Sequence, residues 1–115
     1  MSAGRADSVQ GKSGMRSLDW KRVRHLRAVV PQHVVYRALP SETVLLNIHT
    51  GTYLGMDEVG SRCFEVLRES DDLASALRTL VAEYEAPEER IREDLVGYCK
   101  QLLSNGLIEL EEPDS

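Results

Sequence analysis

Residues 44–64 have the sequence VLLNIHTGTYLGMDEVGSRCF, which predicts a strand, a tight turn, a second strand and the start of a helix. Between Val44 and Ile48 the side chains follow the period of two that is typical of a half-buried strand. Gly51 can adopt a positive φ, as a three-residue hairpin loop with a glycine bulge requires. Asp57 follows the second strand, Thr52–Met56, and its carboxylate can cap the next helix. A hairpin therefore leads directly into a helix.

One more strand is predicted before this hairpin. His33–Leu39 is the strand, and Pro40–Glu42 make the turn into the strand that follows. Short strands that follow one another through tight turns pair as an antiparallel meander. The sequence therefore predicts a three-stranded antiparallel sheet.

Three helices are expected after the sheet. The apolar faces of the first two recur at helical spacing, at Val59, Cys63, Val66 and Leu67, and at Leu73, Leu77, Leu80, Val81 and Tyr84. The third helix, from Pro87 to about Asn105, carries the stripe Ile91, Leu95, Cys99 and Leu102, with Val96, Leu103 and Tyr98 on its margins. This apolar arc spans about 160°, so the helix either lies between two elements or leaves one margin for a partner. The fold class is therefore α+β and winged-helix-like, a three-stranded antiparallel sheet followed by three helices.

The N-terminal region differs in composition from the rest. Residues 1–30 are predicted to be a flexible basic arm, 31–110 the folded domain and 111–115 an acidic tail, with Met1 or Met15 as the start. Between residues 17 and 30, apolar side chains alternate with basic ones. This segment is either a short amphipathic helix that touches a membrane surface or an acidic partner, or a solvated arm with partial structure.

Charge and cysteine usage exclude several classes of protein. Residues 1–37 carry a net charge of +6 and the remainder −11, so the folded part is acidic and poorly suited to phosphate backbones. No apolar run is long enough to span a membrane and no signal peptide is recognisable, which favours a cytoplasmic protein. Cys63 and Cys99 are expected to be buried thiols, since no CxxC or Cys/His cluster supports a disulfide or metal site. No cofactor site is predicted.

Several segments together resemble the PqqD-like family, the RiPP recognition elements that bind precursor peptides in natural-product biosynthesis. The matching residues are Glu42-Thr-Val-Leu-Leu-Asn47, Thr50-Gly-Thr-Tyr53, Met56-Asp-Glu-Val-Gly60, Leu77, Tyr84, Pro87, Asp94-Leu95 and Leu102-Leu-Ser-Asn-Gly-Leu-Ile108. The resemblance covers residues 31–110 and leaves out the basic arm. Residues 47–53 and 57–60 look more like the stand-alone proteins of lasso-peptide clusters than like the pyrroloquinoline-quinone protein.

The resemblance implies a non-catalytic peptide chaperone. The leader segment of a precursor peptide adds as a strand to Thr52–Met56, against the third helix, and is delivered to a leader peptidase or a radical-SAM enzyme. An edge strand has free backbone groups that suit this binding mode. The predicted peptide-binding residues are Thr52, Tyr53, Leu54, Gly55, Ile91, Asp94, Leu95 and Tyr98. The alternatives are that Leu54, Ile91 and Leu95 are core, that Tyr53 and Tyr98 are merely half exposed, and that Asp94 is a solvated charge.

Two other classes of function fit the sequence less well. A winged helix-turn-helix would place the third helix in DNA, but residues 87–103 carry three basic and four acidic side chains. Catalysis finds little support, because His25, His33 and His49 are scattered and Cys63 lies on an apolar helix face. A regulatory subunit that binds a protein partner, and a homodimer paired through the exposed third strand, both remain open.

Overall fold

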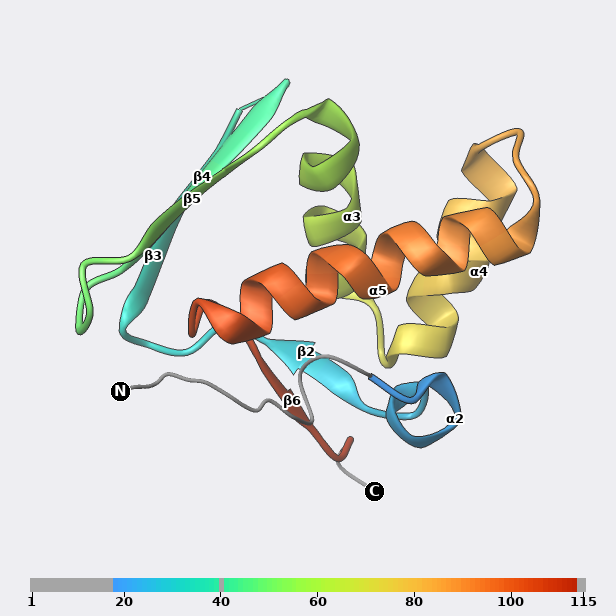
Figure 1. Ribbon diagram of the computed structural model, residues 1–115, viewed down its shortest axis with the longest axis horizontal. Coiled ribbons are helices and arrows are strands. Elements are labelled where there is room, and N and C mark those ends of the chain that lie inside the picture. Colours follow the sequence, from blue (N-terminus) through green and yellow to red (C-terminus); the bar gives the residue numbers. More distant parts are fainter. Residues whose placement is uncertain (1–17, 40, 114–115) are drawn as a thin grey trace.

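The computed structural model describes residues 18–39 and 41–113. The predictions for residues 1–17, for Pro40 and for the end of the acidic tail lie outside this part of the chain. The elements are α2 (Trp20–Val23), β2 (Arg27–Val29), β3 (Val34–Leu39), β4 (Glu42–Asn47), β5 (Tyr53–Met56), α3 (Glu58–Glu69), α4 (Leu73–Glu83), α5 (Glu88–Ser104) and β6 (Glu109–Glu111). The predicted α+β class, with a three-stranded antiparallel sheet followed by helices, is confirmed (Figure 1).

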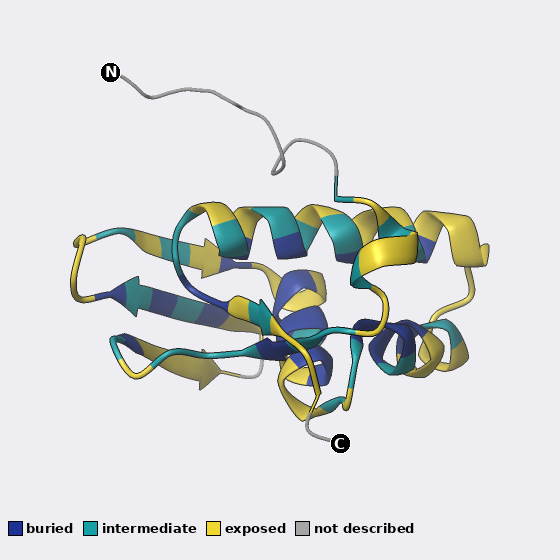
Figure 2. Ribbon diagram, turned by 90° about the horizontal axis from the view of Figure 1, so that it is seen from below, coloured by how far each residue is buried: buried dark blue, intermediate teal, exposed yellow. Residues whose placement is uncertain are grey.

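The larger sheet has the strand order β3-β4-β5, and both strand pairs are antiparallel. Along β4 the buried residues are Thr43, Leu45 and Asn47, while Val44 and Leu46 between them are half-buried. The period of two thus divides the sheet into a face toward the helices and a face toward solvent. Figure 2 shows β5 as the edge strand nearest to α5 and β3 at the far edge.

The turn between β4 and β5 is one residue longer than predicted. The amide of Asn47 donates to the carbonyl of Thr52 at 2.8 Å, so the loop comprises the four residues 48–51, and Gly51 has a φ of +77°. The buried Asn47 side chain holds this wider loop, since its Oδ1 accepts from the amides of His49 and Thr50. Its Nδ2 donates to the carbonyls of Asn105 and Gly106, which ties the hairpin to the end of α5.

Local capping residues set the helix boundaries. Asp57 and Asp72 are the N-caps of α3 and α4, and each side chain accepts from an amide in the first turn. The third helix was predicted to begin at Pro87, but α5 begins one residue later, at Glu88, so Pro87 is its N-cap residue. The Pro87 side chain has no polar atom that could accept a hydrogen bond from the first turn. At the other end of α5, Gly106 has a φ of +67°, and the amide of Leu107 donates to the carbonyl of Leu102 at 2.8 Å. This 6→1 bond is that of a Schellman motif.

The core lies between the inner face of the sheet and the three helices α3, α4 and α5. Its fully buried side chains include Leu45, Phe64, Leu80, Leu95 and Leu102. The predicted stripes are confirmed, with two exceptions at one end of the domain. Val59 and Tyr84 were predicted on buried faces, but they are 42% and 36% exposed. Both lie near the turn between α4 and α5, where no further element of the described chain covers them.

Residues 18–30 are part of the packed structure rather than an arm. β2 pairs with β6, so that Ala28 lies opposite Leu110, and α2 precedes β2. The carbonyls of Arg24 and Leu26 accept from the first-turn amides of α4, at 2.9 Å each. Such amides have no partner within their own helix. The predicted boundary at residue 31 is therefore too late for the folded region. Within the described residues, no helix is long and apolar enough to cross a membrane.

Candidate functional site

The free edge of β5 presents backbone groups that no described strand pairs with. The amide of Asn47 points toward β5, and in an antiparallel pair successive residues point alternately toward and away from the partner strand. Leu54 therefore exchanges bonds with Leu45, opposite it in the register, while the N–H and C=O groups of Tyr53 and Gly55 point outward. This edge can accept an extended peptide.

The side chains of β5 divide between the two faces of the sheet. Tyr53 stands on the outer face, opposite Leu46, and is 68% exposed. Leu54 is half-buried and packs against the core from the inner face. A Cβ on Gly55 would meet no atom within 4 Å, so this position leaves open space on the outer face. Thr52, the remaining predicted strand residue, follows the loop and directly precedes β5, and its hydroxyl oxygen accepts from the hydroxyl of Thr50.

Tyr98 connects α5 to the start of α3. Its hydroxyl donates to Oδ1 of Asp57 at 3.4 Å, and its ring lies so close to Gly60 that a Cβ there would be 2.8 Å from Cε1. Gly60 is therefore closely packed against the Tyr98 ring and the Met56 side chain. Burial, followed by the negative charge of Asp57, raises the pKa of Tyr98, so its hydroxyl stays protonated. Half-buried and next to the end of β5, Tyr98 forms a wall beside the free edge.

An apolar cavity of about 320 Å³ lies between the helices, beyond Tyr98. Two of the predicted residues, Ile91 and Asp94, line it, together with Val59, Cys63, Leu80, Tyr84, Ala86 and Arg90. Four residues of this lining were not predicted as peptide-binding residues: Val59, Tyr84, Ala86 and Arg90. Helical periodicity placed Val59 and Tyr84 on apolar faces, but periodicity does not show which part of a face stays uncovered.

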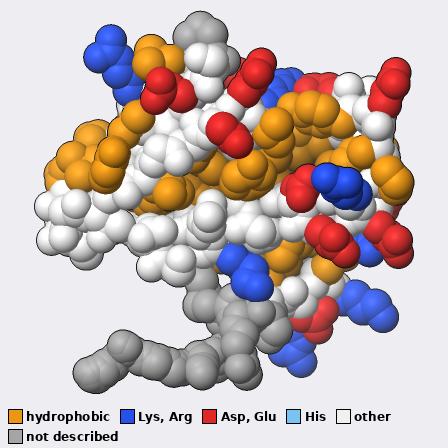
Figure 3. Space-filling model, turned by 45° about the horizontal axis from the view of Figure 1, so that its top comes forward, with side chains coloured by type: hydrophobic (Ala, Val, Ile, Leu, Met, Phe, Trp, Pro, Cys, Tyr) orange, Lys and Arg blue, Asp and Glu red, His pale blue; other side chains and the backbone are white. Residues whose placement is uncertain are grey.

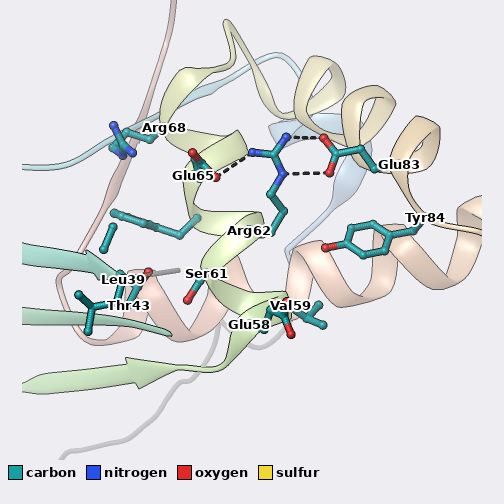
Figure 4. A pocket seen from close by; sticks show the side chains of 12 residues that line it. Leu39, Thr43, Glu58, Val59, Ser61, Arg62, Glu65, Arg68, Glu83 and Tyr84 are labelled. Carbon is teal, nitrogen blue, oxygen red and sulfur yellow. Dashed lines mark hydrogen bonds and ion pairs between the residues drawn. The ribbon is translucent and has the colours of Figure 1, made fainter. Parts of the chain in front are cut away.

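A second, larger hollow of about 720 Å³ lies on the other side of α3, and Val59 and Tyr84 border both (Figure 4). Arg62 crosses it from α3. Its guanidinium donates to both carboxylate oxygens of Glu83 on α4 and to Glu65 on its own helix. The bond from Arg62 lowers the pKa of Glu83. This pair fixes α4 against α3 and so helps to hold the shape of both hollows.

One face of the molecule is largely apolar. Figure 3 shows hydrophobic side chains in a nearly continuous band from the sheet to the far end of the helices, with acidic side chains along its border. Exposed apolar surface that gathers in a band is typical of a binding site.

The structure brings most of the predicted site residues together, but not all. Ile91 and Asp94 on α5 border the apolar cavity, Tyr98 on the same helix contacts the start of α3, and β5 supplies the edge. Leu95 and Ile91 are both buried members of the core, with 0% and 7% of their surface exposed, as the alternative interpretation of these two residues has it, although Ile91 also borders the cavity. The outward-facing Tyr53 side chain lies on the opposite face of the sheet from α5, so it contributes its backbone rather than its ring to this site.

Nucleophilic cysteine chemistry does not fit this region. Burial raises the pKa of Cys63 to about 11 and that of Cys99 to about 12. Both side chains are buried and free, as predicted, and remain thiols near neutral pH. Among the described residues, no group of three His, Cys, Asp or Glu side chains could hold a metal ion.

Solved structures of two peptide complexes are similar to this chain. TbiB1 in complex with the TbiA(beta) leader peptide is 32% identical, with a TM-score of 0.65, over 70% of this chain and 94% of that chain. Lasso peptide synthetase B1 complexed with the leader peptide is 18% identical, with a TM-score of 0.64, over 72% of this chain and 98% of that chain, and shows a shared fold. No curated protein matches the sequence.

The family model of coenzyme PQQ synthesis protein D (PqqD) matches residues 42–108. This range begins at the first residue of β4 and ends after the Schellman motif that terminates α5. It includes the hairpin, the cap at Asp57 and the α4–α5 turn on which the resemblance was based. Because the match spans more than half of the sequence, the chain belongs to the PqqD family.

Proposed function

We propose that this protein binds the leader segment of a ribosomally made precursor peptide, without catalysing a reaction on it. The leader adds as a strand to the free edge of β5 and lies against α5. The observation that carries the proposal is the outward direction of the Tyr53 and Gly55 backbone groups at the edge nearest α5. The similarity to TbiB1 supports the proposal, because TbiB1 is 32% identical to this chain and its structure was solved in complex with a leader peptide.

Affinity and specificity come from different parts of the site. Backbone bonds to Tyr53 and Gly55 are independent of the peptide sequence, whereas alternate side chains of an added strand enter pockets. The side chains that point inward meet Leu54 and Tyr98. The apolar cavity bordered by Val59 and Ile91 accepts a further apolar side chain at the end of the band.

The bound leader is then presented to a separate enzyme. Members of the PqqD family that bind leader peptides are generally non-catalytic, and the fold shared with a lasso peptide synthetase B1 favours a lasso-type pathway with a leader peptidase. Holding the leader on a protein that also contacts the enzyme raises the effective concentration of the core peptide at the active site.

The test is binding of a fluorescently labelled leader peptide, taken from a small open reading frame beside this gene, measured by anisotropy. Tyr53→Pro removes an outward N–H without removing a bond to β4. Ala38→Pro is the matched control, because in the same register its N–H points outward at the other free edge, that of β3. We expect a Kd near 1 μM, about −8 kcal/mol, that Tyr53→Pro weakens at least tenfold and Ala38→Pro leaves within twofold.

Two results would contradict the proposal. The first is equal weakening by both proline variants, which would mean that the β5 edge is not the binding surface. The second is the absence of leader binding together with strongly salt-dependent binding of duplex DNA, which would support a helix-turn-helix function instead.

A further inference from the structure

A further hollow, of about 670 Å³, lies where α2, α4 and α5 meet. Its border carries four cationic side chains and a single carboxylate, that of Glu88. The cations come from three elements: Lys21 and Arg24 from α2 and its end, Arg78 from α4 and Arg92 from α5. We refer to this site as the cationic hollow. Its charge is opposite to that of the folded region as a whole, which is acidic.

These cations are not neutralised by neighbouring carboxylates. Within residues 18–39 and 41–113, the four side chains make no ion pair within 4 Å, whereas Arg22, Arg27 and Arg62 each do. Arg78 donates to the hydroxyl of Ser75 at 3.0 Å. The pKa of Asp72 is lowered first by the bond from Ser75 in the first turn of α4 and then by the charges of Arg78 and Arg24, but its carboxylate forms no ion pair with either arginine within 4 Å. The hollow therefore keeps its positive charge for a ligand.

The floor of the hollow is apolar. Leu77 is buried there, while Trp20 and Val81 pack against the core and keep part of their surface exposed. An apolar floor inside a cationic border fits an acidic polypeptide segment that carries one apolar side chain. Carboxylates of such a segment form charge-assisted bonds to the arginines, and the apolar side chain covers the indole of Trp20.

The cationic hollow and the peptide edge lie on opposite margins of α5. Arg92 and Asp94 are about 160° apart around the helix axis at 3.6 residues per turn. Figure 1 agrees, with the sheet on one side of α5 and α2 on the other. A leader bound at β5 therefore leaves the cationic hollow accessible.

A membrane surface fits this site less well than a protein does. Interfacial helices present a continuous apolar face to lipid. Here α2 is only four residues long, and its apolar neighbours Leu18, Trp20 and Val23 are turned toward the core. The site is concave, and its exposed apolar surface lies below the charges.

We propose that the cationic hollow docks an acidic segment, anchored by one apolar side chain, of the enzyme that acts on the bound leader. The identity of this partner depends on the proposed function, whereas the chemistry of the surface does not. One protein then binds its peptide on one margin of α5 and its enzyme on the other.

The experiment uses the purified leader peptidase, or other precursor-modifying enzyme, encoded beside this gene. Its binding to the full chain is measured by biolayer interferometry at about 50 and 300 mM salt. The test variant is Arg78→Glu/Arg92→Glu. The control is Arg37→Glu, compared with Arg78→Glu alone, and it changes the charge equally at an exposed arginine on β3 outside the hollow. Leader anisotropy is measured on every variant, as a check of fold and of the proposed function.

We expect the test variant to weaken enzyme binding at least tenfold, with leader binding within twofold of the unmodified chain. The control should bind the enzyme normally, and added salt should weaken the unmodified complex. Equal enzyme affinity in test and control variants would overturn the inference. The absence of enzyme binding at low salt would also overturn the inference. Binding of anionic lipid vesicles in place of the enzyme would overturn it as well. If the unmodified chain does not bind the leader, the proposed function is overturned instead. The comparison of enzyme binding between the test and control variants still stands in that case.

Discussion

Gly60→Ala tests how tightly α3 and α5 are packed beside the peptide edge. The new Cβ would lie 2.8 Å from Cε1 of Tyr98 and 3.2 Å from two atoms of Met56. A contact of 2.8 Å is too short for two carbon atoms, so the Tyr98 ring has to move. Its hydroxyl bond to Asp57 and its packing against the core oppose that movement.

Two opposing terms decide the size of the effect. At an interior helical position alanine is favoured over glycine by about 1 kcal/mol, and Gly60, the third residue of α3, gains at most this amount. Overpacking a well-packed contact costs about 1–3 kcal/mol. We therefore expect Gly60→Ala to lower the free energy of unfolding by about 1 kcal/mol.

Gly97→Ala is the matched control for this substitution. Gly97 lies inside α5, and a Cβ there would meet no atom within 4 Å. Only the gain in helix propensity remains, so this variant should be more stable by about 0.5–1 kcal/mol. Urea unfolding measures both variants, and each change corresponds to a shift of the midpoint by about 0.5–1 M.

A double-mutant cycle with Tyr98→Ala locates the cause. Without the ring, Gly60→Ala should lose most of its cost, giving a coupling energy of about 1–2 kcal/mol. Gly60→Ala should also weaken leader binding, because the displaced ring forms the wall beside β5. If Gly60→Ala proves as stabilising as Gly97→Ala, or if the coupling is zero, the packing argument is refuted.

Three further predictions concern stability and reactivity. Asp72→Ala should lower the free energy of unfolding by about 1 kcal/mol, because the Ser75 amide loses its acceptor. That bond lowers the pKa of Asp72, so its contribution is present above pH 4 and is lost as the pH falls through the folded-state pKa. In urea unfolding from pH 7 to pH 2, the difference between Asp72→Ala and the unmodified chain should therefore shrink, and a constant difference would contradict this. Asn47→Ala should cost about 2 kcal/mol, because it leaves carbonyls at the end of α5 and amides in the hairpin loop without partners; an unchanged urea midpoint would disprove it. Cys63 and Cys99 should resist thiol-modifying reagents at pH 8 in the folded protein and react in urea, since burial raises the pKa of Cys63 to about 11 and that of Cys99 to about 12; rapid modification without urea would show that the helices open.

Local signals in the sequence were sufficient for most of the fold. The caps at Asp57 and Asp72, the positive φ at Gly51 and Gly106, and the position of β5 after the hairpin each depend on residues within a few positions. Such signals act through hydrogen bonds and steric limits that close within one turn, and so they can be read without the rest of the chain. The loop of residues 48–51 differs from the prediction because Asn47 also bonds to the distant end of α5.

Long-range packing decided the rest of the site. Periodicity identified the broad apolar face of α5, but only the tertiary structure separates buried Leu95 from half-buried Tyr98. The tertiary structure also places α2 beside the other margin of α5. It does so because β2, which follows α2, pairs with β6, at least 80 residues away in the chain. The sequence by itself thus determined which elements form and where each begins, since those choices are made by neighbouring residues. Which apolar and charged surfaces remain open to a peptide or a partner was decided by contacts between distant segments, which no local pattern encodes.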